Sequence, residues 1–349
     1  MANQPEVNTV TAPPPSSTSD NLLEVRDLRT LFAVEGGGEF AAVDGIAFAL
    51  QAGRTLGIVG ESGCGKSVTA LSIMGLVAQP PGRIGGGNIL FDGVDLLRVP
   101  ASAMRELRGD RISMIFQEPM TSLNPAFTIG DQIVEGIIRH RPESSANARA
   151  LALEMLRRVH IPSPEERFDD YPHRLSGGMR QRVMIAMALA CSPALLIADE
   201  PTTALDVTVQ AQILDLMRQL REETGTAIIL ITHDLGVVAE LADDVVVMYA
   251  GRIVESASVA ALFAEPQHPY TVGLLGSIPR LDLEQTRLAA IEGQVPNPMA
   301  PVEGCRFHPR CPFAFERCRR EDPPLRDLGD GHRSACWRAP LDPDVLVPA

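Results

Sequence analysis

The amino-acid sequence predicts an α/β fold, with a mostly parallel sheet and helices on both of its faces, and three observations predict it. Residues 60–67 match the pattern G-x-x-x-x-G-K-[ST], an apolar run at 56–59 precedes them, and a helix-compatible segment at 68–77 follows. This is the order of strand, phosphate-binding loop and helix that the pattern requires. Two continuous apolar runs, 194–200 and 227–233, are typical of parallel strands buried on both faces. Helical segments alternate with these runs, which favours a parallel sheet.

The N-terminal part of the chain predicts antiparallel strands. Apolar residues alternate along 23–33, three glycines turn the chain at 36–38, and 40–50 returns as a second strand. A Pro/Gly-rich stretch at 80–87 reads as a connector, and an Asp-Gly pair turns a hairpin over 88–96. We therefore expect an antiparallel edge beside the parallel core.

The middle of the chain predicts a helical insertion. Apolar residues recur at helical spacing from 128 to 160, and a second long helical run ends near Cys191. We place this helical subdomain at about 119–190. An amphipathic helix at 209–223 and a hairpin at 244–255 follow.

Composition limits the function classes. With 349 residues the chain has room for roughly two domains. Its net charge of −13 argues against a nucleic-acid footprint, which needs a basic face. Residues 1–20 are rich in Pro, Ser and Thr without an apolar centre, which predicts a disordered tail and no signal peptide. The longest apolar run, 183–198, is too short to cross a bilayer, so any membrane association would come through a partner.

The phosphate loop carries the first set of candidate site residues. Its glycines let successive backbone N–H groups point at phosphate oxygens, and the helix behind it adds its positive end. Lys66 would reach the β- and γ-phosphates, and the Ser67 hydroxyl would hold Mg²⁺. The bland alternative is a glycine-rich turn with a surface lysine. The residues expected to contact the nucleotide are Gly60, Glu61, Ser62, Gly63, Cys64, Gly65, Lys66 and Ser67.

Polar residues at predicted strand ends form the second set. Asp199 would meet Mg²⁺, and Glu200, on the opposite side of the pleat, would polarise water. Gln117 should lie at a strand-to-loop exit because Pro119 disfavours helix before it. His233 ends another buried strand, at the edge where ligands bind in such sheets. Each could instead be an ordinary surface or loop residue.

Two further features could contact a nucleotide. Ser176, Gly177 and Gly178 precede a long helix, giving a second helix N-terminus that can hold an anion, although a simply capped helix start has the same pattern. An aromatic ring, Phe32 or Phe40, could stack on adenine, although ordinary sheet packing is the alternative. We take Phe32 as the candidate.

Taken together, these motifs resemble the nucleotide-binding subunits of ATP-binding cassette (ABC) transporters, over about 21–279. The matching pieces are the phosphate loop 60–67, Gln117, the signature Leu175-Ser176-Gly177-Gly178-Met179, the strand and acids at 195–200, the loop 204–206, and His233. Met179 replaces the more usual Gln. The resemblance implies a nucleotide-binding domain at 21–265 that hydrolyses ATP with Mg²⁺ held by Ser67, Gln117 and Asp199, and with Lys66, Gln117, Glu200 and His233 as catalytic residues. It also implies that Ser176–Gly178 of one subunit closes over ATP held by another.

The remaining segment, 266–349, resembles the carboxy-terminal extension of oligopeptide and dipeptide permease ATP-binding subunits, on residues 268–279, 297–298 and 304–311. This implies peptide import, two membrane-spanning permease subunits, a second related ATPase or a second copy, an extracytoplasmic solute-binding protein, and a peripheral position on the cytoplasmic face of the membrane. Residues 121–125 and the helical insertion would dock the permease. Nickel, glutathione or glycosides remain alternative solutes. A soluble cassette ATPase acting on nucleic acid or ribosomes is the competing class, but those proteins usually carry two cassettes or basic stripes.

Four cysteines crowd into this extension, at Cys305, Cys311, Cys318 and Cys336. A cytosolic chain argues against disulfides, and typical zinc knuckles need closer Cys pairs than these. Neighbouring arginines could offset the charge of four thiolates. A zinc site, an iron–sulfur cluster and unrelated thiols stay open from the residues alone. The peptide-permease resemblance implies a [4Fe–4S] cluster.

Overall fold

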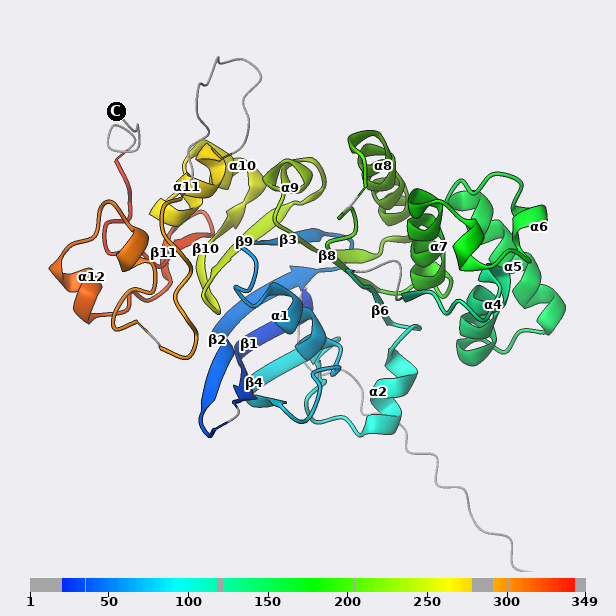
Figure 1. The fold of residues 1–349 in the computed structure, drawn as a ribbon, viewed down its shortest axis with the longest axis horizontal. Coiled ribbons are helices and arrows are strands. Elements are labelled where there is room, and N and C mark those ends of the chain that lie inside the picture. Colours follow the sequence, from blue (N-terminus) through cyan, green and yellow to red (C-terminus); the bar gives the residue numbers. More distant parts are fainter. Residues whose placement is uncertain are drawn as a thin grey trace, which may run out of the picture.

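The computed structural model describes most of the chain after residue 20. The described ranges are 21–34, 36–117, 122–203, 205–277, 291–300 and 302–342. The tail predicted at 1–20, Thr121 of the predicted docking segment and Ala204 of the predicted loop 204–206 lie outside these ranges. The described strands form two sheets, one of eight strands in the order β11-β12-β10-β9-β3-β8-β7-β6 and one of four in the order β2-β1-β4-β5 (Figure 1).

The parallel core of the large sheet contains the predicted buried strands, and β9, predicted only as one strand of a hairpin, belongs to it as well. Its strands are β3 (Thr55–Val59), β6 (Ile112–Ile115), β7 (Leu195–Asp199), β8 (Ala227–Thr232) and β9 (Asp244–Tyr249). Each pairs in parallel with its neighbours in this part of the sheet. Every residue of β3, β7 and β8 is buried, because helices and the second sheet cover both faces.

An antiparallel edge completes the large sheet. The predicted hairpin turns from β9 into β10 (Arg252–Ser258), and β12 (His332–Ser334) and β11 (Arg326–Gly329) extend the sheet beyond it. The last two strands come from the C-terminal extension and are absent from the prediction. They have three and four residues, too few to show an alternating pattern. Pairing of β12 with β10, and of β11 with β12, stabilises them.

The predicted N-terminal strands are present, but they form a separate small antiparallel sheet and not an edge of the parallel one. A second prediction, the connector, is corrected as well. Strands β1 (Asn21–Ala33) and β2 (Glu39–Gln51) pair as expected, and β4 (Gly82–Phe91) turns into β5 (Val94–Asp95). The stretch predicted as a connector at 80–87 is largely strand, paired with β1. Glycine is needed here because the strands pack closely and not because the chain turns. A Cβ on Gly87, for example, would lie 2.5 Å from the Asp27 carbonyl oxygen.

Helices cover the sheets on both sides. The helices outside the insertion are α1 (Lys66–Ile73), α2 (Ala101–Leu107), α8 (Val207–Thr224), α9 (Leu235–Leu241), α10 (Val259–Ala264), α11 (Pro269–Gly276) and α12 (Glu316–Arg320). Helix α1 contacts β1, β2 and β7 and therefore lies between the two sheets, whereas α8 and α9 lie on the other side of the parallel core (Figure 1).

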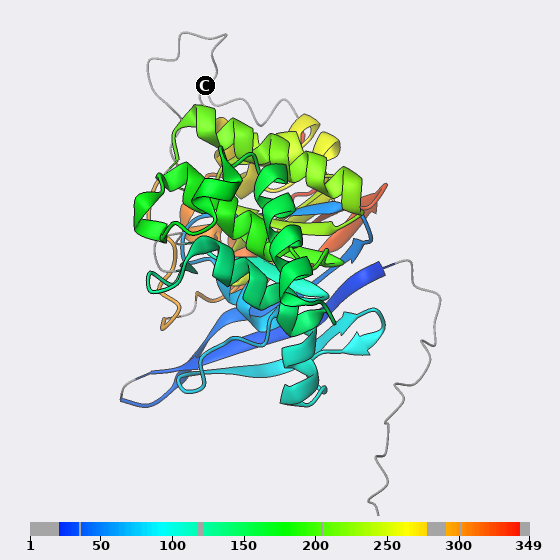
Figure 2. The same cartoon turned by 90° about the vertical axis from the view of Figure 1, so that its right-hand side faces the viewer.

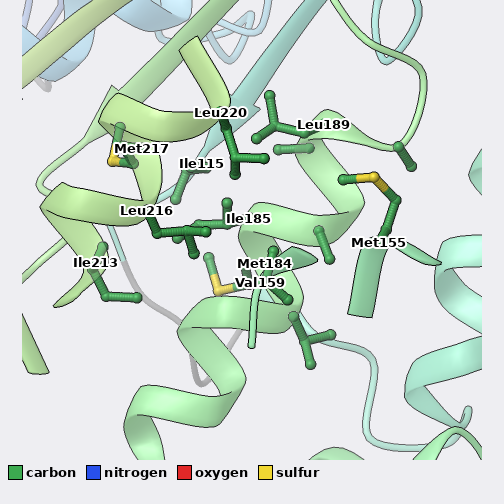
Figure 3. Packing of buried hydrophobic residues seen from close by; sticks show 14 of the residues in the cluster. Ile115, Met155, Val159, Met184, Ile185, Leu189, Ile213, Leu216, Met217 and Leu220 are labelled. Atoms are coloured by element: carbon green, nitrogen blue, oxygen red, sulfur yellow. The ribbon is translucent and has the colours of Figure 1, made fainter. Parts of the chain in front are cut away.

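The predicted helical insertion is present as a separate lobe. Its described α-helices are α4 (Ile129–His140), α5 (Ser145–Arg158), α6 (Pro164–Arg167) and α7 (Gly177–Leu189), with a 3-10 turn at Pro172–Arg174 before the last. Figure 2 shows these green helices in front, with the blue and cyan strands below them. Buried residues of α5 and α7 join those of α8 in one cluster, so the insertion shares its core with the parallel sheet (Figure 3). No helix in the described ranges is both long and apolar enough to cross a membrane.

Candidate active site

The phosphate loop between β3 and α1 has a backbone that only glycine accommodates at two of its turns. Gly60 and Gly65 have φ of 149° and 105°. A Cβ on Gly60 would lie 2.2 Å from the Met248 carbonyl oxygen, and one on Gly65 would lie 2.4 Å from that of Ala42. The loop is therefore wedged between β2 and β9. Its last glycine, Gly65, begins helix α1, whose first N–H groups have no side-chain cap and suit an anion.

Two predicted phosphate and magnesium residues lie in this loop. The Lys66 ammonium is almost buried and donates to the carbonyl oxygens of Gly60, at 2.7 Å, and Glu61, at 3.1 Å. The Ser67 hydroxyl donates to Asp199 Oδ1 at 3.1 Å. Burial raises the pKa of Asp199, although the bond from Ser67 counteracts it. The structure thus brings together the hydroxyl and the carboxylate that the sequence predicts as Mg²⁺ ligands.

Glu200 is the centre of a second group of polar side chains. Gln117 Nε2 lies 3.2 Å from Glu200 Oε2, Thr203 donates its hydroxyl to the same oxygen at 2.8 Å, and His233 Nδ1 lies 3.3 Å from Oε1. Burial alone would raise the pKa of Glu200, but the hydrogen bonds from Thr203 and His233 lower it below its usual range. Glu200 is therefore a carboxylate at neutral pH, able to accept a hydrogen bond from water.

The backbone of Glu200 is also unusual. Its φ is 49°, in the left-handed region that non-glycine residues avoid, and strain of this kind is concentrated at functional sites. Its N–H donates to the Ile231 carbonyl oxygen at 2.8 Å, which fixes the turn after β7 against β8. Gln117, Glu200 and His233 follow β6, β7 and β8, so the predicted residues meet at the carboxyl edge of the sheet. Thr203 was not predicted, because a threonine in a turn carries no chemical signal of its own.

A cavity of about 520 Å³ lies beside the phosphate loop. Its lining includes Phe40 of β2, Ser62 and Gly63 of the loop, and Asn297 and Met299 of the extension. The rings of Phe32 and Phe40 stack with centroids 5.8 Å apart, but it is Phe40 that lines the cavity. The Phe32 edge lies 3.0 Å from where a Cβ on Gly82 would be, so Phe32 also packs within the small sheet.

The second predicted anion site lies elsewhere in the molecule. Ser176 caps α7 by accepting the Met179 N–H at 3.3 Å, and Ser176 and Gly177 are exposed. Helix α7 belongs to the insertion and is well separated from α1 in Figure 1. Within one chain, the helix start at Ser176–Gly178 and the phosphate loop are therefore two distinct sites.

The four cysteines of the extension converge but do not form a site for one metal ion. Cys305, Cys311, Cys318 and Cys336 are free thiols that line one small cavity. Three of them accept a backbone N–H from the residue two positions later, as in the bond from Arg338 N to Cys336 Sγ at 3.4 Å. Burial, helped by the neighbouring thiols, raises the pKa of Cys305 to about 12 and that of Cys311 to about 11.

The described residues contain no group of three or more His, Cys, Asp or Glu side chains placed to hold a metal ion. The geometry therefore does not support the zinc alternative, and neither the structure nor the comparisons below show the expected iron–sulfur cluster. The four cysteines line one cavity, but the described residues do not support the metal that the sequence analysis expects there.

Comparison with known proteins identifies the family. The family described as "ABC transporter" matches residues 43–203, and that described as "Oligopeptide/dipeptide transporter, C-terminal region" matches residues 254–318. A probable peptide ABC transporter ATP-binding protein of Sinorhizobium fredii is 56% identical over 92% of this chain and 96% of its own length. The chain belongs to the ABC transporter ATP-binding proteins.

Other ABC relatives agree. A dipeptide transport ATP-binding protein of Bacillus subtilis is 52% identical over 91% of this chain and 95% of its own, and an oligopeptide transport ATP-binding protein of Escherichia coli is 50% identical over 95% and 97%. Among solved structures, a dimeric post-hydrolysis ATP-binding cassette bound to ADP and Pi has a TM-score of 0.61 and 25% identity, covering 68% of this chain and 98% of that one. The ABC fold expected from the motifs is thereby confirmed, and the family is an ATPase family.

Proposed function

We propose that this ABC protein is the ATP-hydrolysing subunit that powers peptide import through a membrane permease. The observation that supports it most is the Glu200 carboxylate, held by Gln117, Thr203 and His233 at the edge where the phosphate loop lies. Relatives at 50–56% identity are named as peptide, dipeptide or oligopeptide transport proteins. Import of nickel, glutathione or glycosides would use the same ATPase site, but the match to the peptide-transporter C-terminal region favours peptides.

The residues divide the reaction between them. Loop amides from Gly60 to Gly65 and the Lys66 ammonium would bind the phosphates, and Ser67, Asp199 and Gln117 would hold Mg²⁺. When bound, Mg²⁺ supplies charge neutralisation at the phosphate oxygens. The Glu200 carboxylate would orient a water and accept its proton, because its hydrogen bonds keep it ionised. His233, within hydrogen-bond distance of Glu200, would help to orient that carboxylate and would contact the γ-phosphate of bound ATP.

The second helix start explains why such a subunit works in pairs. Ser176, Gly177 and Gly178 are accessible and lie apart from the loop of their own chain. We place them over the γ-phosphate of ATP bound to a second subunit, where the helix end attracts the anion. ATP binding would then join the two subunits, and hydrolysis would release them. The partner is a related ATP-binding subunit or a second copy.

The remaining assignments complete the transporter. Two permease subunits would contact residues 121–125 and the helical insertion, and a solute-binding protein would deliver peptide from outside. The subunit would thus be peripheral on the cytoplasmic face of the membrane. The adenine would occupy the side of the loop where Phe40, stacked on Phe32, lines the cavity.

We also propose the [4Fe–4S] cluster for the cysteine-rich extension. Its support is that four thiols line one cavity and that backbone N–H groups reach three of the sulfurs, as at iron–sulfur centres. A cluster spreads its four ligands more widely than one ion does. Bound there, it would cross-link the extension. Iron and acid-labile sulfide near zero in anaerobically purified protein would refute it.

The Glu200→Gln variant tests the catalytic assignment. Glutamine keeps the shape and the hydrogen-bond acceptor but cannot take a proton, so ATP hydrolysis should fall by about 10²–10⁴-fold. ATP binding should stay near the wild-type value, because the loop residues hold the phosphates. The matched control, Glu106→Gln, alters an exposed carboxylate that pairs with Arg139 and should leave both quantities unchanged. Near-normal hydrolysis in Glu200→Gln would remove Glu200 from the catalytic role.

A further inference from the structure

A partly buried ion pair joins the C-terminal extension to the phosphate loop. Arg310 Nη1 donates to Glu61 Oε2 at 2.6 Å, and Nη2 donates to Oε1 at 3.0 Å. The Arg310 side chain is 3% exposed and that of Glu61 is 30% exposed. Paired, parallel bonds of this kind fix both distance and orientation. Glu61 is the second residue of the phosphate loop, so the extension grips the loop directly.

Arg310 is itself held rigidly. It also donates to the carbonyl oxygens of Ile291, at 3.1 Å, and Glu292, at 3.0 Å, and to the Tyr249 hydroxyl at 3.4 Å. The pair with Glu61 raises the pKa of Arg310 further above its ordinary value, so the guanidinium is always charged. Because its other donors are engaged, Arg310 cannot follow Glu61 if the loop moves. The pair therefore constrains the loop.

A second contact holds the backbone of the same residue. The Tyr270 hydroxyl accepts the Glu61 N–H at 2.8 Å. Tyr270 is fully buried, with its ring 4.7 Å from that of Tyr249 and 5.4 Å from that of Phe307. In the next peptide unit, the Glu61 carbonyl oxygen accepts from Lys66 at 3.1 Å. The side chain and the backbone of Glu61 are thus both tied to the extension.

We propose that Arg310 and Tyr270, acting through Glu61, are positioning residues that hold the phosphate loop in its ATP-binding shape. A loop with three glycines loses much conformational freedom when it closes on phosphates. Holding it in advance lowers that entropic cost and so raises affinity. Gln117, Glu200 and His233, the residues expected to activate water, follow other strands. The contacts of Arg310 and Tyr270 with Glu61 should therefore affect ATP binding and not the chemical step. This inference rests on the ATPase function proposed above.

Single and double variants of the pair test the inference in the full-length protein. Glu61→Gln and Arg310→Met should each raise the Kd for MgATP, and the KM for hydrolysis, about 5–20-fold, with kcat changed less than about threefold. The double variant should bind MgATP no more weakly than Arg310→Met does, because both substitutions remove the same interaction. Arg310→Lys keeps the positive charge but loses the paired hydrogen bonds of the guanidinium. It should therefore bind MgATP more tightly than Arg310→Met and more weakly than the wild type. Tyr270→Phe should also raise the Kd, since it removes the acceptor for the Glu61 N–H.

A matched control distinguishes the loss of the Arg310–Glu61 contact from the loss of a negative charge elsewhere in the protein. Arg26 and Glu24 on β1 also form a paired contact, at 2.6 and 2.7 Å, but Arg26 is 58% exposed and far from the loop in sequence. Glu24→Gln should leave Kd, KM and kcat unchanged.

Three results would overturn the inference. These are a wild-type Kd in Glu61→Gln, additive losses in the double variant, or a fall in kcat at constant KM. If Arg310→Met fails to fold, Glu61→Gln and Tyr270→Phe still decide the question. A wild-type protein that neither binds nor hydrolyses ATP would instead refute the proposed function itself.

Discussion

Replacing Asp44 by asparagine should destabilise the protein more than the same kind of replacement at any exposed charged residue on the same strand. Asp44 lies on β2 and is 11% exposed. Its carboxylate accepts from Arg29 of β1 at 3.1 Å, from Arg252 of β10 at 2.9 Å, and from Arg306 of the extension. Burial alone would raise the pKa of Asp44, but the bond from Arg252 and the charges of the three arginines lower it. One carboxylate therefore joins both sheets and the extension.

The magnitude follows from the charges left behind. Removing one partner of a buried ion pair costs about 3–5 kcal/mol, because the other charge stays in a poorly solvated place. Arg29 and Arg252 remain partly exposed, at 48% and 40%, so water can compensate in part. We therefore expect a loss of about 3 kcal/mol, at the lower end of that range. For a chain of 349 residues the loss lowers the melting temperature by about 4 °C.

Urea and thermal unfolding at pH 7.5 would measure this difference. The control is Glu39→Gln, on the same strand, whose exposed pair with Arg83 is worth less than about 1 kcal/mol. The folded protein holds the pKa of Asp44 down, so this stabilisation is present above the unfolded value of about 3.9 and is lost as pH falls through the folded pKa. The difference in the free energy of unfolding between the wild type and Asp44→Asn should thus become smaller in acid. Equal stability of the two proteins at pH 7.5 would refute the reasoning.

Three further predictions concern the core, the loop and the catalytic carboxylate. Ile185→Ala, in the fully buried cluster of Figure 3, should cost about 2–5 kcal/mol in urea unfolding. Gly60→Ala should abolish ATP binding in a direct titration, because the new Cβ would lie 2.2 Å from the Met248 carbonyl oxygen. Thr203→Val should shift the acid limb of the ATPase pH profile to higher pH, because the Thr203 hydroxyl lowers the pKa of Glu200.

The parts of the fold that depend on local pattern were predictable from the sequence. Strands β7 and β8 are buried along their whole length, so their apolar runs stand out. The carboxyl ends of neighbouring parallel strands must lie at one edge, and this rule alone brings Glu200 close to His233. The phosphate loop needs glycines at fixed spacing, so the residues themselves display the pattern.

The parts that depend on distant contacts were not predictable. Glu61 and Arg310 are 249 positions apart, and in the sequence Arg310 is only one of several arginines near the cysteines. The stretch 80–87 reads as a connector because proline and glycine usually mark turns, whereas here the glycines allow close approach to β1. In each case the deciding partner belongs to another part of the chain.

These distant contacts also change the meaning of the boundary near residue 266. The C-terminal region matches as a family of its own, yet its Phe307 packs against Tyr249 of β9 with ring centroids 5.2 Å apart. Glu255 of β10 is fully buried and accepts from His332 at 2.7 Å and from the Gln267 N–H at 2.5 Å. Cutting the chain at 266 would expose the Tyr249 ring and remove both hydrogen-bond partners of the Glu255 carboxylate. The extension therefore packs as part of the same fold as the nucleotide-binding domain. Contacts from both parts hold the phosphate loop.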